Sequence, residues 1–154
     1  ALAARRGKRR TLRIGITKAE REQYRELLKT LDLGLEDRLT ARVGLLSGGQ
    51  RQALTLLMAT MNKPKLLLLD EHTAALDPKA ADIVMELTDK LVNEKKITSL
   101  MVTHNLRYAV EYGTRTIMMH DGDIIMDVSG AERTDIGIDN YLKVFNEISL
   151  EKGN

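Results

Sequence analysis

The sequence contains no cysteine, no tryptophan, two prolines and one phenylalanine among its 154 residues. Without cysteine the chain can form neither a disulfide nor a cysteine-ligated zinc site. No apolar run approaches the roughly 20 residues that are needed to span a bilayer. The first residues, Ala1 to Ala4, are too short for the apolar region of a signal peptide. We expect the chain to begin inside a longer structural element.

Length and composition indicate one globular domain with its own core, because 43% of the residues are hydrophobic and 30% are charged. The net charge of +2 is uneven, since residues 5–10 carry +5 and the remainder sums to −3. Such a basic run can bind nucleic acid or an anionic lipid surface, or it can be a solvated helix face or loop. The scarcity of aromatic side chains that could stack on bases favours a solvated segment. We therefore predict no nucleic-acid partner.

One motif that a self-sufficient phosphate site needs is absent. The pattern Gly-x-x-x-x-Gly-Lys-Ser/Thr, whose backbone amides and lysine hold nucleotide phosphates, occurs nowhere in the sequence. The pair Gly7-Lys8 is followed by arginine rather than by serine or threonine. In contrast, Ser47-Gly48-Gly49 opens a helical pattern, and the amides at a helix N-terminus bind anions. The sequence thus indicates half of a phosphate site.

Hydrophobic periodicity and turn residues predict an α/β fold, with a mostly parallel sheet that is flanked by helices. Thr17 and Glu20 form a predicted capping box. Residues 44–49 are predicted to form a turn, and Asp121-Gly122 predicts a hairpin. The helix predicted over residues 50–61 is apolar nearly all round, so we expect it to be well buried. Helices are predicted over residues 18–31, 50–61, 79–95, 105–112 and 139–148, and strands over residues 65–70, 98–103, 115–120 and 123–128.

Polar residues follow the two strands that are predicted at the centre of the sheet. Asp70-Glu71 ends the first strand and His104 follows the second, so a parallel sheet brings them to one edge. The carboxylates can hold Mg²⁺ through water and reach an attacking water, although most acidic pairs at strand ends are solvated or salt-bridged. His104 can contact a phosphate oxygen or serve as a structural histidine. Asp77 before Pro78 fits a helix N-cap, which explains it without a catalytic role.

Four motifs occur in an order that is typical of one family. The sequence resembles the nucleotide-binding domain of ABC transporters, a P-loop NTPase-like fold, over nearly its whole length. The matching segments are the signature at residues 46–50, the Walker B strand at residues 66–71, the D-loop at residues 74–77 and the switch histidine at residues 102–104.

The resemblance implies ATP and Mg²⁺ as cofactors, catalytic roles for Glu71 and His104, and a metal-binding role for Asp70. Asp70 would hold Mg²⁺ through a water molecule. Glu71 would act as the general base toward the attacking water, and His104 would contact the γ-phosphate. The complete protein would be an ATPase that converts ATP and water into ADP and phosphate.

The resemblance also implies contact with a second ATP-binding domain, in a homodimer or a heterodimer. Asp77 would communicate across that dimer interface. Residues 1–45 would form part of the helical subdomain, and residues 46–154 the C-terminal part of the ATPase core, ending in a β-hairpin and a helix. The signature would bind, in trans, a nucleotide held mainly by the partner domain, through Ser47, Gly48, Gly49 and Gln50.

Two departures from the family pattern matter. His72 stands where proline is most common, and we expect the chemistry to tolerate it. The Walker A loop, the adenine-stacking aromatic residue and the Q-loop glutamine would lie upstream of Ala1. Because the Walker A loop supplies most of the phosphate-binding free energy, we expect the chain alone to bind ATP poorly and to be inactive. Without the Walker A strand, residues 66–69 and 98–102 should expose an unpaired edge and an apolar face, leaving the chain marginally stable or paired with another chain.

Three functional hypotheses follow from the resemblance. The first is the ATPase subunit of a membrane transporter, cytoplasmic and peripheral at the inner face of the membrane. Its partners would be transmembrane permease subunits and a solute-binding protein, and we favour import without naming a substrate. The second is a truncated, non-catalytic fragment that donates its signature in trans. The third is an ABC-type DNA-repair ATPase, which the lack of sustained heptads before Ser47 disfavours.

Overall fold

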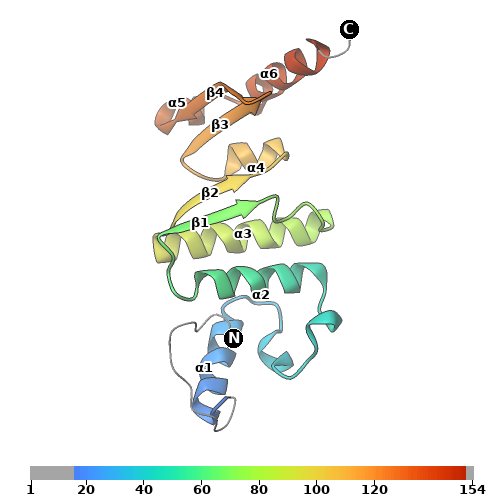
Figure 1. The fold of residues 1–154 in the computed structure, drawn as a ribbon, viewed down its shortest axis with the longest axis vertical. Helices are drawn as coiled ribbons and strands as arrows, with labels where there is room; N and C mark the ends of the chain where they lie inside the picture. The colour runs from blue at the N-terminus through green and yellow to red at the C-terminus, as the bar shows by residue number, and fades with distance from the viewer. Residues whose placement is uncertain (1–15, 152–154) are drawn as a thin grey trace. The chain divides into compact units, whose positions relative to one another are not determined.

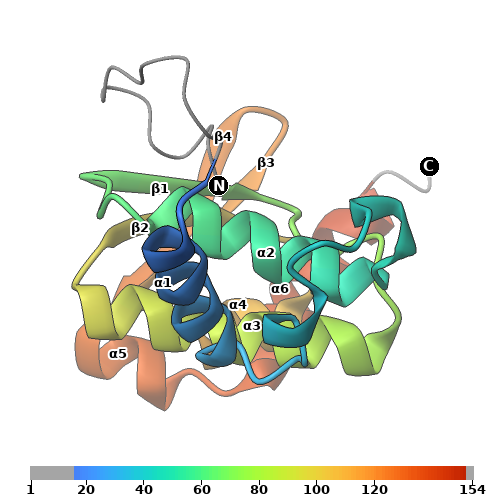
Figure 2. The same ribbon diagram turned by 90° about the horizontal axis from the view of Figure 1, so that it is seen from below.

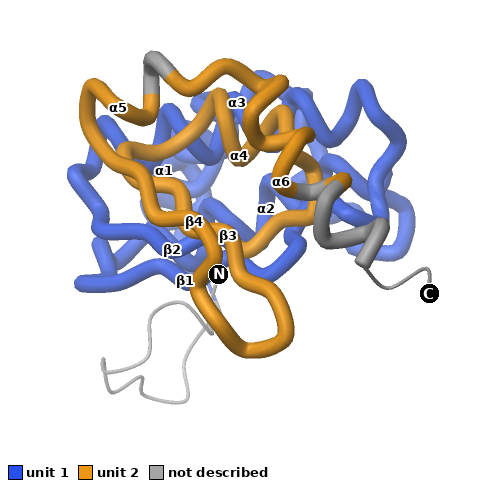
Figure 3. Tube along the Cα trace, turned by 90° about the horizontal axis from the view of Figure 1, so that it is seen from above, with its two compact units in different colours: residues 1–101 blue, residues 102–154 orange. Residues whose placement is uncertain are grey.

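The chain forms two compact units, residues 1–101 and residues 102–154 (Figure 3). The computed structural model describes residues 16–151, so the basic run at residues 5–10 lies outside the described part. The division that the sequence predicts at residue 45 falls within the first unit and stays a prediction.

Three α-helices and one strand pair make up most of the first unit. The helices α2 and α3 lie side by side (Figure 2), and α3 connects the strands β1 and β2, whose arrows point the same way (Figure 1). This β-helix-β unit confirms the predicted α/β class. The elements are α1 (Lys18–Lys29), the 3₁₀ turns η2 (Glu36–Arg38) and η3 (Val43–Leu45), α2 (Gly48–Thr60), β1 (Leu66–Asp70), α3 (Pro78–Lys95) and β2 (Thr98–Val102).

Side-chain caps begin the helices where the sequence predicts them. The Thr17 hydroxyl accepts a hydrogen bond from the Glu20 amide at 3.2 Å, and the Glu20 carboxylate accepts one from the Thr17 amide at 3.0 Å. This reciprocal pair is the predicted capping box. At the start of α3, Asp77 accepts from the Ala80 amide at 3.0 Å, and Pro78 occupies the first helical position. The N-cap prediction for Asp77 is therefore confirmed.

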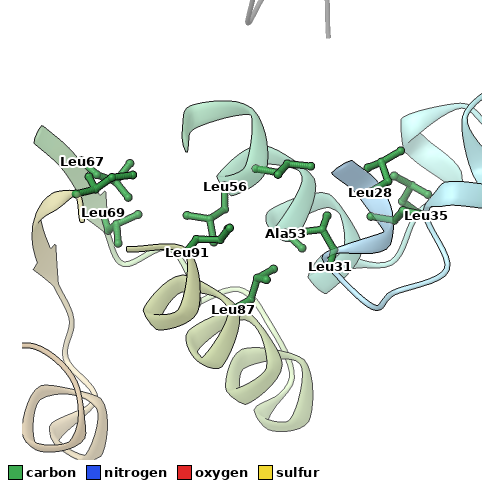
Figure 4. Close-up of a cluster of buried hydrophobic side chains, with 12 residues drawn as sticks. Leu28, Leu31, Leu35, Ala53, Leu56, Leu67, Leu69, Leu87 and Leu91 are labelled. Atoms are coloured by element: carbon green, nitrogen blue, oxygen red, sulfur yellow. The ribbon is translucent and has the colours of Figure 1, made fainter. Parts of the chain in front are cut away.

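The core of the first unit is a cluster of leucines that joins its three helices to β1 (Figure 4). Full burial of one such side chain contributes roughly 1.5–3 kcal/mol relative to exposure. The cluster fixes the end of β1 against the helices. Its members are Leu28, Leu31, Leu35, Leu46, Ala53, Leu56, Leu57, Leu67, Leu69, Leu87, Leu91 and Ile97.

The strand β1 is buried on one face only. Leu67 and Leu69 are 6% and 9% exposed, whereas Leu66 and Leu68 are 51% and 66% exposed. On β2, Leu100 is likewise 56% exposed. A central parallel strand is normally covered on both faces, whereas β1 is covered on one. Leu66 and Leu68 thus form an exposed apolar face on β1, as the sequence analysis expects for residues 66–69.

The second unit contains a hairpin and three helices, α4 (Leu106–Glu111), α5 (Gly130–Asp135) and α6 (Ile138–Glu151). The antiparallel strands β3 (Arg115–His120) and β4 (Asp123–Ser129) pair from Arg115 opposite Ser129 to His120 opposite Asp123. Asp121 and Gly122 both take positive φ, 47° and 94°, as a type I′ turn requires. The Asp-Gly hairpin prediction is confirmed.

Several predicted boundaries are wrong by a few residues. The helix α1 ends at Lys29 rather than at residue 31, because Asp32 takes a left-handed conformation with φ of 52°. Gly48 and Gly49 belong to the first turn of α2 and not to the preceding turn. Ala59 is exposed, so α2 is buried on one side rather than all round. The helix α5 is not predicted by the sequence pattern.

Within residues 16–151, no helix combines the length and the apolarity that crossing a membrane requires.

Candidate functional site

The signature residues Ser47 and Gln50 build the start of α2. The Ser47 hydroxyl oxygen accepts from the Gln50 amide at 3.2 Å, and the Gln50 side-chain oxygen accepts from the Ser47 amide at 3.1 Å. The Gln50 side-chain nitrogen donates to the Leu33 carbonyl at 3.0 Å, which ties the signature to the chain after α1. Ser47 and Gln50 thus stabilise the helix N-terminus reciprocally.

This cap leaves donors at the tip of α2. The Ser47 hydroxyl is used as an acceptor, so its own proton stays available for donation. Among the residues that the structure describes, no acceptor is found for the amides of Gly48 and Gly49. Two amides, one hydroxyl and the positive end of the helix dipole therefore occupy one exposed tip, an arrangement that suits a phosphate.

Gly48 and Gly49 also lie against the start of α3. A Cβ added to Gly48 would come within 2.9 Å of Leu76 Cδ2, and one added to Gly49 would come within 3.2 Å of Ala80 Cβ. Leu76 precedes the N-cap Asp77, and Ala80 donates its amide to that cap. The first turns of α2 and α3 are therefore in close contact. The sequence offers a phosphate as the reason for the glycines, and this packing is a second reason that it does not reveal.

The carboxylates Asp70 and Glu71 stand at the exposed end of β1. Glu71 takes φ of 41°, a left-handed conformation that is rare for a non-glycine residue, and its carbonyl accepts from the Ala74 amide at 2.9 Å. Both residues line a pocket of about 430 Å³ between α2, β1 and the loop that leads from β1 to α3. Strained conformations of this kind are concentrated at functional sites.

His72 is anchored to α3, a contact that the sequence does not predict. Its Nε2 lies 3.2 Å from the Thr88 hydroxyl oxygen, and that hydroxyl donates to the Val84 carbonyl at 2.7 Å. Because Thr88 uses its proton on Val84, it accepts from His72, which places the imidazole proton on Nε2. Burial lowers the pKa of His72 below its usual 6.5, so the ring is neutral at pH 7. His72 thereby holds the residue after Glu71 to the crossover helix.

His104 follows β2 and belongs to the second unit, so its approach to Glu71 stays a prediction. The helix that follows it is capped at both ends. At its start, the Asn105 side chain accepts from the Arg107 amide at 3.0 Å. At its end, the buried Arg133 guanidinium donates to backbone carbonyls of α4. Arg133 is 17 residues or more from these partners, and no sequence motif identifies it.

The residues at the end of β1 fit a magnesium ion. Mg²⁺ prefers carboxylate oxygens, keeps several waters, and is usually bound through one or two carboxylates together with substrate phosphates. Exposed Asp70 with its neighbour Glu71 supplies such a pair. Within the described part of the chain, no group of three or more acids and histidines gathers into an all-protein metal cage. Asp70 could thus hold Mg²⁺ only together with water and a nucleotide.

Comparison with known proteins identifies the relatives of this chain. Residues 4–74 match a family model described as ABC transporter. The chain is 52% identical over 119 residues to a tyrosine transport ATP-binding protein of Clostridioides difficile, covering 77% of this chain and 47% of the relative. It is 37% identical over 118 residues to a phosphonates import ATP-binding protein of Haloquadratum walsbyi, covering 76% and 39%.

Solved structures show the same fold. The dimeric bacterial ABC transporter cassette MJ0796 superposes with a TM-score of 0.57 at 34% identity, covering 76% of this chain and 50% of the cassette. The chain spans about half of that cassette and less than half of the two relatives. The matches therefore cover only part of each relative, and they do not show the activity of a complete cassette for this chain.

Proposed function

Because the chain belongs to the ABC transporter ATP-binding family, we propose that it carries the signature and the catalytic carboxylates of an ATPase that drives transport across a membrane. The complete subunit hydrolyses ATP to ADP and phosphate. The observation that best supports this proposal is the end of β1. There, Asp70 and the left-handed Glu71 line a pocket between β1, α2 and the loop before α3.

The residues divide the chemistry between them. Asp70 would hold Mg²⁺ through water, and the ion would neutralise charge on the phosphate oxygens. The Glu71 carboxylate accepts a proton from the water that attacks the γ-phosphorus. His104 donates a hydrogen bond to the γ-phosphate. The bond between the γ-phosphorus and the bridging oxygen breaks, and the electron pair leaves with ADP.

The signature acts on a nucleotide that the partner domain holds. The donors at the α2 tip, namely the Ser47 hydroxyl and the amides of Gly48 and Gly49, fit a γ-phosphate. Gln50 supports them through the cap, and Asp77 communicates across the dimer. The sequence has no Gly-x-x-x-x-Gly-Lys-Ser/Thr loop. The cis site of this chain therefore needs a phosphate cradle from elsewhere, and the chain alone is inactive.

The partners follow from the family. A second ATP-binding domain completes each site, and the dimeric cassette MJ0796 supports this assembly. Transmembrane permease subunits and a solute-binding protein provide the transport path, and the subunit lies in the cytoplasm at the inner face of the membrane. We favour import, because the Haloquadratum walsbyi relative is an import ATP-binding protein. Tyrosine is the first substrate to test, because the 52% identical relative is a tyrosine transport protein.

A second candidate function is a non-catalytic chain that only donates its signature in trans. The feature that favours it is the lack of a Gly-x-x-x-x-Gly-Lys-Ser/Thr loop within the 154 residues, because the signature needs no such loop in its own chain. Comparing ATP binding and turnover by this chain with those of the complete subunit separates the two candidates. Both candidates predict that the chain alone is inactive, so the complete subunit decides between them: turnover by the complete subunit would exclude the non-catalytic reading, and its absence would exclude the ATPase proposal.

Glu71→Gln in the complete subunit tests the catalytic proposal. Loss of a general base should lower turnover by about 10²–10⁴-fold. ATP binding should persist, because the amide keeps the size and the hydrogen-bonding capacity of the carboxylate, and the dimer should be trapped with ATP. Glu86→Gln, on the exposed side of α3, is the matched control and should leave turnover unchanged. Wild-type turnover in Glu71→Gln would refute the assignment of Glu71 as the base.

A further inference from the structure

The signature and the D-loop segment meet at one small contact. The glycines of the first turn of α2 face Leu76 and Ala80. A Cβ on Gly49 would lie 3.2 Å from Ala80 Cβ and 3.9 Å from its Cα. Ala80 has no rotatable side chain, so the helix backbone must move to relieve that contact. Leu76 is longer and can change rotamer, which makes the Gly48 contact the softer of the two.

Ala80 is hydrogen-bonded to the D-loop aspartate, Asp77. Its amide donates to Asp77 Oδ1 at 3.0 Å, and the Ala81 amide donates to the Asp77 carbonyl at 2.9 Å. Asp77 thus lies one hydrogen bond away from the residue that Gly49 touches. Any displacement of the α2 tip against α3 acts on the cap that orients Asp77.

We propose that Ala80 and Leu76 are positioning residues for the signature. They form a fixed joint between the α2 tip and Asp77, and Gly48 and Gly49 are glycines so that this joint can close. The joint transmits engagement of the partner's ATP by the signature to Asp77 in the same chain. This coupling rests on the proposed function, whereas the joint itself is a property of the fold.

The joint predicts that the effect of Gly49→Ala on the Tm changes sign when Ala80 is replaced by glycine. Alanine favours a helix over glycine, so Gly49→Ala should stabilise α2 if nothing opposed the new Cβ. Against Ala80 the Cβ is crowded, and Gly49→Ala should instead lower the Tm of the chain by roughly 2–4 °C. In an Ala80→Gly background the crowding is gone, and Gly49→Ala should raise the Tm. Equal effects of Gly49→Ala in both backgrounds would overturn the joint.

Gly44 provides a matched control for this cycle. It lies in η3 without a positive φ, and a Cβ at this position would meet no atom within 4 Å. Gly44→Ala should therefore leave the Tm unchanged or raise it, in either background. A loss of Tm equal to that of Gly49→Ala would mean that glycine replacement is harmful in general, which would also overturn the joint.

Turnover in the complete subunit tests the coupling. Gly49→Ala should lower kcat by up to about 100-fold, the effect of a misplacement near one ångström. Its KM for ATP should stay close to wild type, because the partner domain holds the nucleotide. Gly49→Ala/Ala80→Gly should recover most of kcat. A double variant that regains Tm but not kcat would overturn the coupling, since the glycine would then act on the nucleotide alone.

Failure of the proposed function would give a different pattern of results. If the wild-type complete subunit neither binds nor hydrolyses ATP, the proposed function and the coupling both fall. The Tm cycle needs no nucleotide, so it still decides whether Ala80 and Gly49 form the joint.

Discussion

Arg133→Met should destabilise the second unit by about 3 kcal/mol. Arg133 is 8% exposed, and its methylenes would be replaced by a side chain of similar apolar length. Its guanidinium donates from Nη2 to the carbonyls of Ala109 (3.2 Å), Val110 (2.6 Å) and Tyr112 (2.6 Å), and from Nε to the Thr116 hydroxyl (2.9 Å).

The magnitude follows from what the variant leaves behind. The last four carbonyls of a helix have no partner within the helix, and Arg133 supplies one for the end of α4. A buried carbonyl without a partner costs about 1–3 kcal/mol. The carbonyls of Val110 and Tyr112 lose this partner, whereas the Ala109 carbonyl keeps the Thr116 hydroxyl at 3.0 Å. At about 1.5 kcal/mol for each of the two, the loss is about 3 kcal/mol. Removal of the buried charge offsets part of a larger loss.

Arg115→Met is the matched control because Arg115 belongs to the adjoining hairpin and makes the more familiar interaction. Its guanidinium forms two hydrogen bonds to the Asp127 carboxylate, at 2.8 Å and 2.5 Å, with side-chain exposures of 59% and 37%. Such an exposed pair is typically worth less than about 1 kcal/mol. The arginine bonded to neutral carbonyls should therefore matter more than the one in the salt bridge.

Hydrogen exchange measures both variants at the right place. Arg133→Met should speed exchange of the amides in residues 108–112 by about 100-fold, the equivalent of about 3 kcal/mol of local opening. The exchange rate in Arg133→Lys should lie between those of the wild type and Arg133→Met, because an ammonium group cannot donate in the planar geometry of a guanidinium. Equal exchange in Arg133→Met and Arg115→Met would refute the reasoning, since the carbonyl cap would then be worth no more than a surface ion pair.

Neighbouring leucines of β1 should differ in urea titrations: Leu67→Ala, at a buried position, should lose about 2–5 kcal/mol of unfolding free energy, and Leu68→Ala, at an exposed one, less than about 0.5 kcal/mol. Burial lowers the pKa of His72, so the unfolded state binds a proton at a higher pH than the folded state does. The free energy of unfolding should therefore be constant above pH 6.5 and decline below it, by at most about 1.4 kcal/mol per pH unit. Urea titrations from pH 8 to 5 should show this decline, and His72→Gln should reduce its slope. Ser47→Ala should lose about 1 kcal/mol of stability with the cap, whereas Ser47→Asp should keep that stability yet weaken ATP-dependent dimerisation, because the carboxylate accepts from Gln50 but repels phosphate.

Local interactions are the part of this fold that the sequence predicts well. The Thr17 capping box, the Asp77 cap and the Asp121-Gly122 turn each depend on residues at most three apart. Their geometry follows from the chain itself. The α/β class and the order of the elements other than α5 follow in the same way, because the hydrophobic pattern shows periods of 3.6 residues for helices and 2 residues for strands.

Contacts between distant residues are the part that the sequence does not predict. His72 bonds to Thr88, 16 residues away, and Arg133 to carbonyls more than 20 residues away. Many polar residues could have been the partner in each case, and the packing of helices selects one. For β1 the sequence predicts an exposed apolar face over residues 66–69, but the packing of the helices selects Leu67 and Leu69 as the buried pair and leaves Leu66 and Leu68 exposed.

The signature motif shows why a motif alone is an incomplete guide to its own residues. Ser47 and Gln50 are already engaged in capping α2, and Gly48 and Gly49 in admitting α3. What remains for a ligand is one hydroxyl proton and two amides, and the cap aims them before any nucleotide arrives. An anion that binds there loses little free energy in ordering its donors. The same residues therefore stabilise the fold and present donors to a ligand. Only variants that keep the cap or the joint, such as Ser47→Asp and Gly49→Ala/Ala80→Gly, can separate these two roles.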